Sequence, residues 1–175
     1  MTRRIKSCAF TGYRPQKMPW GFNEDDPRCE DFKHRLKDMI LVMILEGYRH
    51  FISGAAMGTD LWGAQYILEF KKEFPDLTLE MAIPFEGQAE KWSYEYRNLR
   101  ESVMRSADKI TLISRNYTRN CMFDRNRYMV QNADAVIAAY DGQEGGTKMT
   151  VKMARRMSVP VVLVPPTKSA ISKTA

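Results

Sequence analysis

Histidine and cysteine are scarce in this chain of 175 residues, which has two histidines and three cysteines. The cysteines are widely spaced, odd in number and form no C-x-x-C pair, so we expect neither a disulfide framework nor a zinc site. His34 falls within an expected helix and His50 near the amino end of an expected strand. No Ser/His/Asp or Cys/His arrangement emerges, and we assign no catalytic residue and no metal ligand.

Long apolar runs are also missing, since none reaches the roughly eighteen residues that a membrane helix needs. Residues 1–5 lead directly into a strand-like segment and not into the apolar region of a signal peptide. We therefore expect a cytoplasmic protein that does not enter a membrane.

The composition, with 44% hydrophobic and 27% charged residues, suits one globular domain with a single core. We expect this domain to span residues 1–165 and the apolar-poor residues 166–175 to form a flexible tail. The net charge of +6 favours anionic partners, either nucleic acid or phosphorylated small molecules. The sequence leaves the oligomeric state undecided, and a homo-oligomer stays open.

Strand-like and helical patterns alternate along the chain. The expected strands cover 5–10, 50–53, 77–83, 109–113, 135–139 and 160–164. The expected helices cover 28–46, 59–72, 88–106, 122–132 and 147–157. This alternation predicts an α/β fold with a doubly wound, mainly parallel sheet of about six strands and helices on both faces.

The turn between the second strand and the second helix is rich in small residues. Between an apolar run at 51–52 and the helical pattern from 61 it contains Ser53, Gly54, Ala55, Gly58 and Asp60. Small residues let the backbone approach a ligand, and the first N–H groups of a helix attract anions such as phosphate. The alternative is a tight packing turn in which Asp60 caps the first helical turn.

A second glycine cluster, formed by Gly145, Gly146 and Thr147, opens the fifth expected helix. Ligands of doubly wound sheets bind beyond the carboxyl ends of the strands, where both clusters should lie. Two such helix starts favour a ligand site over two purely structural turns. The first and third strands bring further polar or small residues to the same edge, namely Thr11, Gly12, Arg14 and Pro84.

Two other segments allow both a functional and a structural interpretation. The connection 11–27 is unusually long, which is typical either of a binding loop or of an Ω-loop packed by its own aromatic residues. A later segment interleaves aromatic and basic residues, which suits stacking on a single nucleic-acid strand or, equally, an amphipathic helix that buries its aromatic residues. These residues are Trp92, Tyr94, Tyr96, Arg97 and Arg100.

Five ordered motifs resemble the YpsA-like branch of the SLOG superfamily, over residues 6–165. They are Thr11-Gly12-x-Arg14-Pro15, Ser53-Gly54-x-Ala56-x-Gly58-x-Asp60, Ile83-Pro84-Phe85 followed by Trp92, Arg125-Asn126-x-x-Met129-Val130 and Asp141-Gly142-x-x-Gly145-Gly146-Thr147. SLOG proteins are Rossmann-like, and they include the DNA-processing protein DprA and the cytokinin-activating LOG phosphoribohydrolases.

The resemblance implies a pocket for a nucleotide or a nucleotide-derived ligand such as an ADP-ribose species. One half of its phosphate cradle would be Gly54, Ala55 and Gly58, and the other half Gly146 and Thr147. The pocket would be bordered by Thr11, Gly12 and Arg14, and the polar end of the ligand would contact Arg125 and Asn126. Alternatively, Arg125 and Asn126 lie on a helix face that makes surface ion pairs with Asp124 or Asp134.

One departure from the resemblance bears on activity. LOG hydrolases carry a glutamate three residues after the threonine of their glycine-rich motif, and Thr150 occupies that position here. A threonine cannot supply the negative charge that stabilises an oxocarbenium-like transition state, although Glu86 or Asp60 stands on a neighbouring loop. The sequence therefore leans away from an enzyme.

The sequence favours binding of a nucleotide-type small molecule, with a sensory or regulatory role. The first alternative is DprA-like binding of single-stranded DNA, which we expect to be weak. The further alternative is an enzyme that acts on the N-glycosidic bond of a nucleoside or nucleotide. A nucleotide-type ligand is the only cofactor that the sequence suggests.

Overall fold

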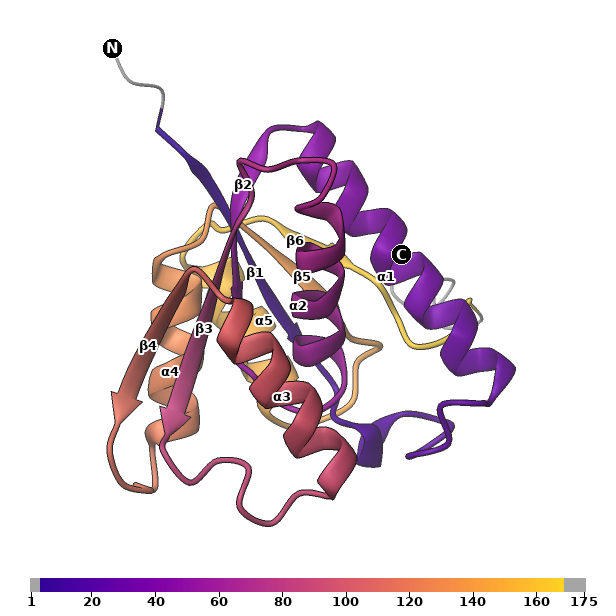
Figure 1. Ribbon diagram of the computed structural model, residues 1–175, viewed down its shortest axis with the longest axis vertical. Helices are drawn as coiled ribbons and strands as arrows, with labels where there is room; N and C mark the ends of the chain where they lie inside the picture. Colours follow the sequence, from indigo (N-terminus) through magenta and orange to yellow (C-terminus); the bar gives the residue numbers. More distant parts are fainter. Residues whose placement is uncertain (1–3, 169–175) are drawn as a thin grey trace.

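A computed structural model describes residues 4–168, in which six strands form one sheet (Figure 1). The strands are β1 (Lys6–Gly12), β2 (Tyr48–Ser53), β3 (Thr78–Phe85), β4 (Lys109–Ser114), β5 (Ala135–Ala139) and β6 (Val161–Leu163). They lie in the order β4-β3-β2-β1-β5-β6, and every neighbouring pair is parallel. The expected parallel sheet is confirmed.

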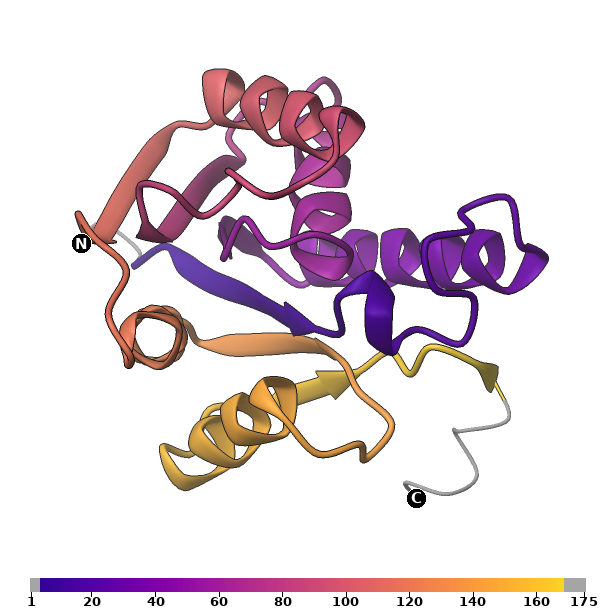
Figure 2. The same ribbon diagram turned by 90° about the horizontal axis from the view of Figure 1, so that it is seen from below.

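Five α-helices and one short 3-10 helix connect the strands. They are η1 (Pro15–Lys17), α1 (Pro27–Leu45), α2 (Thr59–Phe70), α3 (Tyr94–Ser106), α4 (Cys121–Gln131) and α5 (Gly146–Arg156). Figure 2 shows α1, α2 and α3 on one face of the sheet and α4 and α5 on the other. This is the doubly wound arrangement that the alternating pattern predicts.

The strand order reverses between β1 and β5, which pair directly with each other. Strands β2, β3 and β4 step away from β1 on one side, and α4 then returns the chain to the other side of β1. In a doubly wound sheet, the carboxyl ends of the strands at such a reversal form a crevice. The fold therefore places the ends of β1 and β5 where a ligand site is expected.

Helix α1 illustrates how the sequence sets the elements. Asp26 caps its start by accepting a hydrogen bond from the Arg28 backbone N–H (2.9 Å), and a proline occupies the first helical position. Phe32, Leu36 and Ile40 recur at helical spacing and are fully buried in the core. The helix therefore packs its apolar side against the rest of the domain, as its sequence pattern predicts.

The expected helix over 88–106 begins later than the sequence indicates. Ser93 caps α3 by accepting a hydrogen bond from the Tyr96 backbone N–H, and turns fill most of residues 86–92. Gln88 is buried in this connection, where its side-chain amide donates to the Gly54 carbonyl (3.2 Å). That bond to a distant loop fixes the connection in a non-helical path.

A buried polar cluster ties β2, β3, β4 and α4 together around Glu80, whose side chain is 2% exposed. The Glu80 carboxylate is bonded to His50 (2.7 Å), to Thr111 (2.7 Å) and to the Tyr128 hydroxyl. Burial alone raises the pKa of Glu80, but these bonds and nearby Lys109 outweigh burial and hold the pKa at about 2. The ionised carboxylate therefore stabilises this side of the sheet.

The carboxyl-terminal segment is held in place where the structure describes it. Residues 166–168 contact α1, because Arg35 donates to the Pro166 carbonyl (2.9 Å) and Lys168 pairs with Asp31 (2.8 Å). The remainder of the expected tail, 169–175, lies outside the described residues. Within 4–168, no helix is both long enough and apolar enough to cross a bilayer.

The three cysteines are buried free thiols. Burial raises the pKa of Cys8 to about 12 and that of Cys29 to about 11. Both thiols therefore stay protonated at neutral pH and act as small apolar groups in the core.

Candidate functional site

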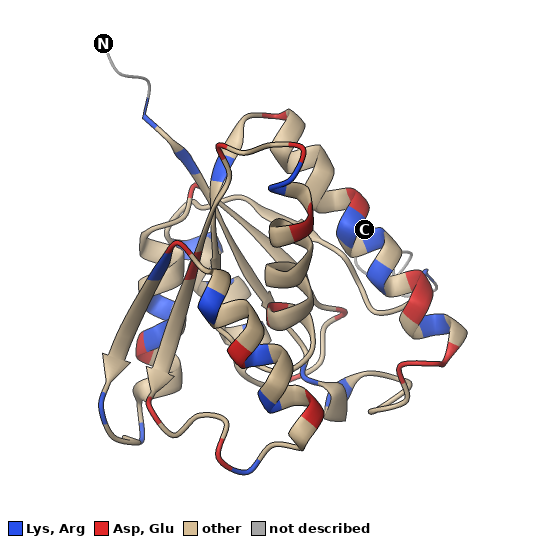
Figure 3. Cartoon of the chain, viewed as in Figure 1, with Lys and Arg blue, Asp and Glu red and all other residues tan. Residues whose placement is uncertain are grey.

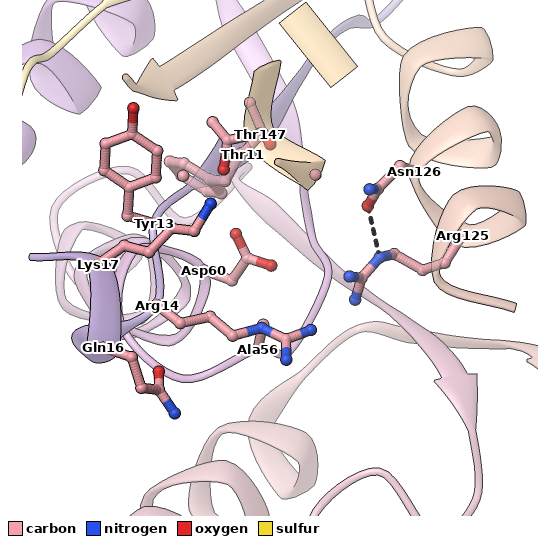
Figure 4. A pocket seen from close by; sticks show the side chains of 13 residues that line it. Thr11, Tyr13, Arg14, Gln16, Lys17, Ala56, Asp60, Arg125, Asn126 and Thr147 are labelled. Carbon is pink, nitrogen blue, oxygen red and sulfur yellow. Dashed lines mark hydrogen bonds between the residues drawn. The ribbon is translucent and has the colours of Figure 1, made fainter. Parts of the chain in front are cut away.

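A cavity of about 350 Å³ opens at the carboxyl edge of the sheet (Figure 4). Its wall comes from the end of β1 and the following loop, the start of α2, the first turns of α4 and the start of α5. The lining residues are Phe10, Thr11, Gly12, Tyr13, Arg14, Gln16, Lys17, Ala56, Asp60, Arg125, Asn126, Gly146 and Thr147.

The long loop after β1 is anchored by a buried aromatic residue and also contributes to the cavity. The Tyr13 hydroxyl donates to the Asp141 carboxylate (2.7 Å) and accepts from the Gln143 backbone N–H (2.9 Å). Further along, Lys17 donates to the Glu144 carbonyl, close to the start of α5. Packing by the aromatic residue therefore also positions the cationic side chains of this loop at the cavity.

The small-residue turn before α2 is tightly wound. Ala55 and Gly58 have φ angles of +56° and +86°, in the left-handed region that non-glycine residues seldom adopt. Ser53 supports the turn, because its hydroxyl donates to the Asp60 carbonyl (2.7 Å) and accepts from the Ala55 N–H (3.3 Å). The turn is buried from residue 53 to residue 58.

The Asp60 carboxylate lies at this turn, where the backbone N–H groups of Ala56 and Gly54 lower its pKa. The turn therefore already holds an anion that belongs to the chain itself. A Cβ added at Gly54 would meet Arg125 Nη1 at 2.6 Å and Asp60 Oδ2 at 2.7 Å. The absence of a side chain at Gly54 makes room for this charged pair.

Arg125 is 4% exposed and lies on the first turns of α4, with its guanidinium on the same side of Gly54 as the Asp60 carboxylate. It donates through Nη1 to the Gly54 carbonyl and through Nε to Asn126 Oδ1 (2.8 Å). Burial lowers the pKa of Arg125, and the charge of Asp60 opposes that shift. The guanidinium is thus a fixed interior cation at the cavity wall.

The alternative of surface ion pairs for Arg125 is wrong. Asp124 pairs with Arg127 (3.1 Å), and Asp134 pairs with Arg4. The two carboxylates that the sequence offered as partners are therefore engaged by other arginines, and Arg125 points inward.

Asp60 is the one acidic residue among the lining residues, and it is 7% exposed. Burial raises the pKa of Asp60 to about 6, although Arg125, the two N–H groups and Arg14 each lower it. One carboxylate oxygen, Oδ1, is buried and has no hydrogen-bond partner. Figure 4 shows this carboxylate between the side chains of Lys17 and Arg14.

The start of α5 remains open to an external anion. Gly145, at φ +133°, precedes the helix, and no side chain caps it. The first helical hydrogen bond runs from the Met149 N–H to the Gly145 carbonyl (3.1 Å), so the preceding N–H groups face outward. A Cβ added at Gly146 would meet nothing within 4 Å, which leaves space in front of these groups.

Thr150 lies one turn further along α5 and is not among the lining residues. Its side chain is buried, and its hydroxyl donates to the Gly146 carbonyl within the same helix (3.0 Å). The residue at the position of the LOG glutamate therefore uses its hydroxyl for a hydrogen bond within α5. Glu86, the other acid that the sequence offered, is exposed and also does not line the cavity.

The structure brings eight of the fourteen predicted site residues to the cavity wall: Thr11, Gly12, Arg14, Asp60, Arg125, Asn126, Gly146 and Thr147. The other six lie behind or beside the wall, and they stay predictions as ligand contacts: Ser53, Gly54, Ala55, Gly58, Pro84 and Gly145. Sequence reasoning did not assign the other five lining residues to the site: Phe10, Tyr13, Gln16, Lys17 and Ala56. For Gln16 and Lys17, the length of their loop was the only signal that could have found them.

The aromatic and basic segment before and within α3 lies apart from the lining residues. Tyr96 is buried, whereas Tyr94 is 69% exposed and Arg97 is exposed. Arg100 donates to Gln88 Oε1 (3.4 Å). The helix buries only part of its aromatic side chains, so neither of the two interpretations of this segment accounts for all of it.

Comparison with known sequences gives consistent matches over most of the chain. A family model for YpsA, described as the "YspA SLOG family", matches residues 8–160. A UPF0398 protein of Bacillus cereus (strain B4264) is 31% identical over 155 residues, which cover 87% of this chain and 84% of the relative. A UPF0398 protein of Bacillus pumilus (strain SAFR-032) is 28% identical over 153 residues, which cover 86% of this chain and 82% of the relative.

Solved structures with the same fold are more distant in sequence. The DNA-processing protein DprA of Streptococcus pneumoniae gives a TM-score of 0.62 at 15% identity, over 91% of this chain and 50% of that chain. The DprA of Helicobacter pylori, whose structure was reported for its single-stranded DNA binding mode, gives a TM-score of 0.61 at 15% identity, over 97% of this chain and 73% of that chain. The protein TM1055 gives a TM-score of 0.58 at 17% identity, over 90% of this chain and 72% of that chain. Likeness at this level of identity concerns the fold alone.

Proposed function

The chain belongs to the YpsA family of SLOG proteins, and on that premise we propose that its cavity binds a nucleotide or nucleotide-derived ligand through a phosphate. The proposed role is sensory or regulatory and not catalytic, because the hydroxyl at the position of the LOG glutamate is bonded inside α5. The protein would thus report or transmit the presence of its ligand without consuming it.

The observation that carries this proposal is the convergence of cations on an uncapped helix start. Arg14 and Lys17 line the same cavity as Gly146 and Thr147, at the first turn of α5. The helix start offers free N–H groups and the positive end of the helix dipole, and the two side chains add two positive charges. A phosphate group matches both features, because its oxygens accept several charge-assisted hydrogen bonds.

The size and the remaining wall of the cavity support a nucleotide over a bare phosphate ion. About 350 Å³ falls within the range of small-molecule sites, which begins at roughly 300 Å³. Beyond the proposed phosphate position, Thr11, Gln16 and Asn126 add hydroxyl and amide groups that suit the sugar and base of a nucleotide.

Single-stranded DNA is the alternative partner, and no surface feature of residues 4–168 favours it over a small ligand. Figure 3 shows Lys and Arg alternating with Asp and Glu along α1 and α3 on the side that it presents. Such mixing weakens the positive field that neutralises a phosphate backbone. The cations that do converge line a cavity, which suits a small ligand better than an extended strand.

Isothermal titration calorimetry with AMP, GMP and ADP-ribose tests the proposal directly. We expect at least one of them to bind the wild-type protein. Arg14→Ala should weaken that binding about tenfold, because one charge-assisted hydrogen bond to the ligand is lost. The Arg14 side chain is exposed, so the substitution should leave the fold intact.

Arg155→Ala is the matched control, since Arg155 is exposed in the last turn of the same α5 and does not line the cavity. It removes the same charge and should change affinity by no more than roughly twofold, because surface charges are well screened. No binding of any of the three compounds, or an equal loss in both variants, would contradict the proposed site.

A further inference from the structure

The unpartnered oxygen of Asp60 indicates which part of a ligand this cavity recognises. We propose that Asp60 Oδ1 accepts a hydrogen bond from a sugar hydroxyl of the ligand, so that the cavity selects ribose phosphates over their deoxy analogues. This inference rests on the proposed function, because it assigns the group that follows the phosphate in the same cavity.

The two oxygens of the Asp60 carboxylate have different surroundings. Oδ2 lies on the Gly54 side, where a Cβ would meet both Oδ2 (2.7 Å) and Arg125 Nη1 (2.6 Å). Oδ1 is buried without any hydrogen-bond partner, a state that only Trp20 Nε1 shares among the side chains of residues 4–168. A buried acceptor without a donor costs free energy, and a ligand that supplies the donor recovers it.

The charges around Asp60 restrict what that donor can be. Arg14, Lys17 and Arg125 line the same cavity, so a metal cation or an ammonium group would be repelled. Within 4–168 there is also no group of three His, Cys, Asp or Glu side chains that could hold a metal ion. A neutral donor is left, and a hydroxyl group meets that requirement.

The position of Asp60 relative to α5 indicates a hydroxyl near the phosphate. Asp60, Gly146 and Thr147 line one cavity of about 350 Å³. In a nucleoside 5′-phosphate the sugar directly follows the phosphate, and the base lies beyond it. A phosphate at the start of α5 therefore brings the sugar hydroxyls toward Asp60 before any amino group of the base.

The test is a set of calorimetric titrations with AMP, 2′-deoxy-AMP, 3′-deoxy-AMP and inorganic phosphate at pH 8, where Asp60 is ionised. We expect AMP to bind roughly tenfold or more tightly than at least one deoxy compound, because a hydrogen bond to a charged group is lost. If AMP and both deoxy compounds bind within about threefold of each other, the inference is overturned and the phosphate site stands. If none of the four binds, the inference is overturned, and the proposed function fails as well when GMP and ADP-ribose also do not bind.

Asp60→Asn assigns the discrimination to this side chain. The variant keeps the shape of Asp60 but replaces one acceptor oxygen by an amide donor and removes a negative charge. The ratio of AMP to deoxy-AMP affinity should fall toward one, while inorganic phosphate should bind at least as tightly as to the wild type. Full discrimination in a folded Asp60→Asn protein would place the hydroxyl elsewhere. If the variant does not fold, the wild-type titrations alone decide.

Discussion

Replacement of Arg125 by Met should destabilise the ligand-free protein, and by an amount that depends on pH. Arg125 is 4% exposed, bonds to the Gly54 carbonyl and faces the Asp60 carboxylate. Removing one member of a buried charged pair typically costs about 3–5 kcal/mol, because the other charge is left uncompensated. At pH 8, where Asp60 is ionised, we expect a loss in this range for Arg125→Met.

At pH 5 the expected loss is smaller, because Asp60 is then largely protonated. Its pKa rises from 3.8 in the unfolded chain to about 6 in the folded protein. This raised pKa adds about 3 kcal/mol to the free energy of unfolding when Asp60 is protonated, at roughly 1.4 kcal/mol per unit of pKa difference. The contribution is fully present below pH 3.8 and is lost as the pH rises through 6. With Asp60 neutral, Arg125→Met removes mainly hydrogen bonds and packing, which we put at about 1–2 kcal/mol.

The measurement is urea denaturation followed by tryptophan fluorescence at pH 5 and pH 8, for wild type, Arg125→Met, Asp60→Asn and the double variant. At each pH the free energies of unfolding of the four proteins are compared with one another, so that the contributions of the other titrating groups cancel. In the Asp60→Asn background, the cost of Arg125→Met should no longer depend on pH. Equal losses at both pH values in the wild-type background, or a pH dependence that persists in the double variant, would refute this account of the pair.

Three further predictions concern the glycines, the buried cluster and catalysis. Gly146→Val should abolish nucleotide binding in a folded protein, because a Cβ at Gly146 meets open space, whereas Gly54→Val should unfold the domain by colliding with Arg125. Calorimetry measures the binding and circular dichroism the folding. Gly87→Val is the control, because a Cβ there meets only the flexible Glu90 side chain. Glu80→Gln should lower the free energy of unfolding, measured by urea denaturation, by about 3 kcal/mol at pH 7. The difference between the variant and the wild type should vanish as the pH falls from 4.5 to 2, because the ionised Glu80 carboxylate loses its stabilising effect over that range. Chromatography should detect no free base from AMP, and base release that scales with protein concentration and disappears in Gly146→Val would contradict the non-catalytic role.

The fold could be predicted because it depends on short-range patterns. Alternating apolar strands and helical segments indicate a parallel, doubly wound sheet, and all six strands and five helices lie close to their expected positions. The exception is the late start of α3, which depends on a bond between Gln88 and Gly54. A contact between residues so far apart in the chain leaves no local signal.

The candidate site was predictable only in part, for the same reason. The start of α5 follows from a glycine cluster at a strand end, and the structure places Gly146 and Thr147 at the cavity as expected. Gly54 looked similar in sequence, yet the space beside its Cα is occupied by Arg125 and Asp60. Glycines that admit a ligand and glycines that admit a side chain have the same local pattern, and only the tertiary contacts separate them.

The most direct test of the central claim is a crystal structure of the protein grown with a saturating concentration of AMP. We predict the phosphate at the first turn of α5, within hydrogen-bond distance of the Gly146 and Thr147 N–H groups and of Lys17, with a ribose hydroxyl against Asp60. Density for AMP away from this cavity, for example along the exposed face of α3 near Arg97, or a cavity that stays empty while AMP binds in solution, would contradict the account.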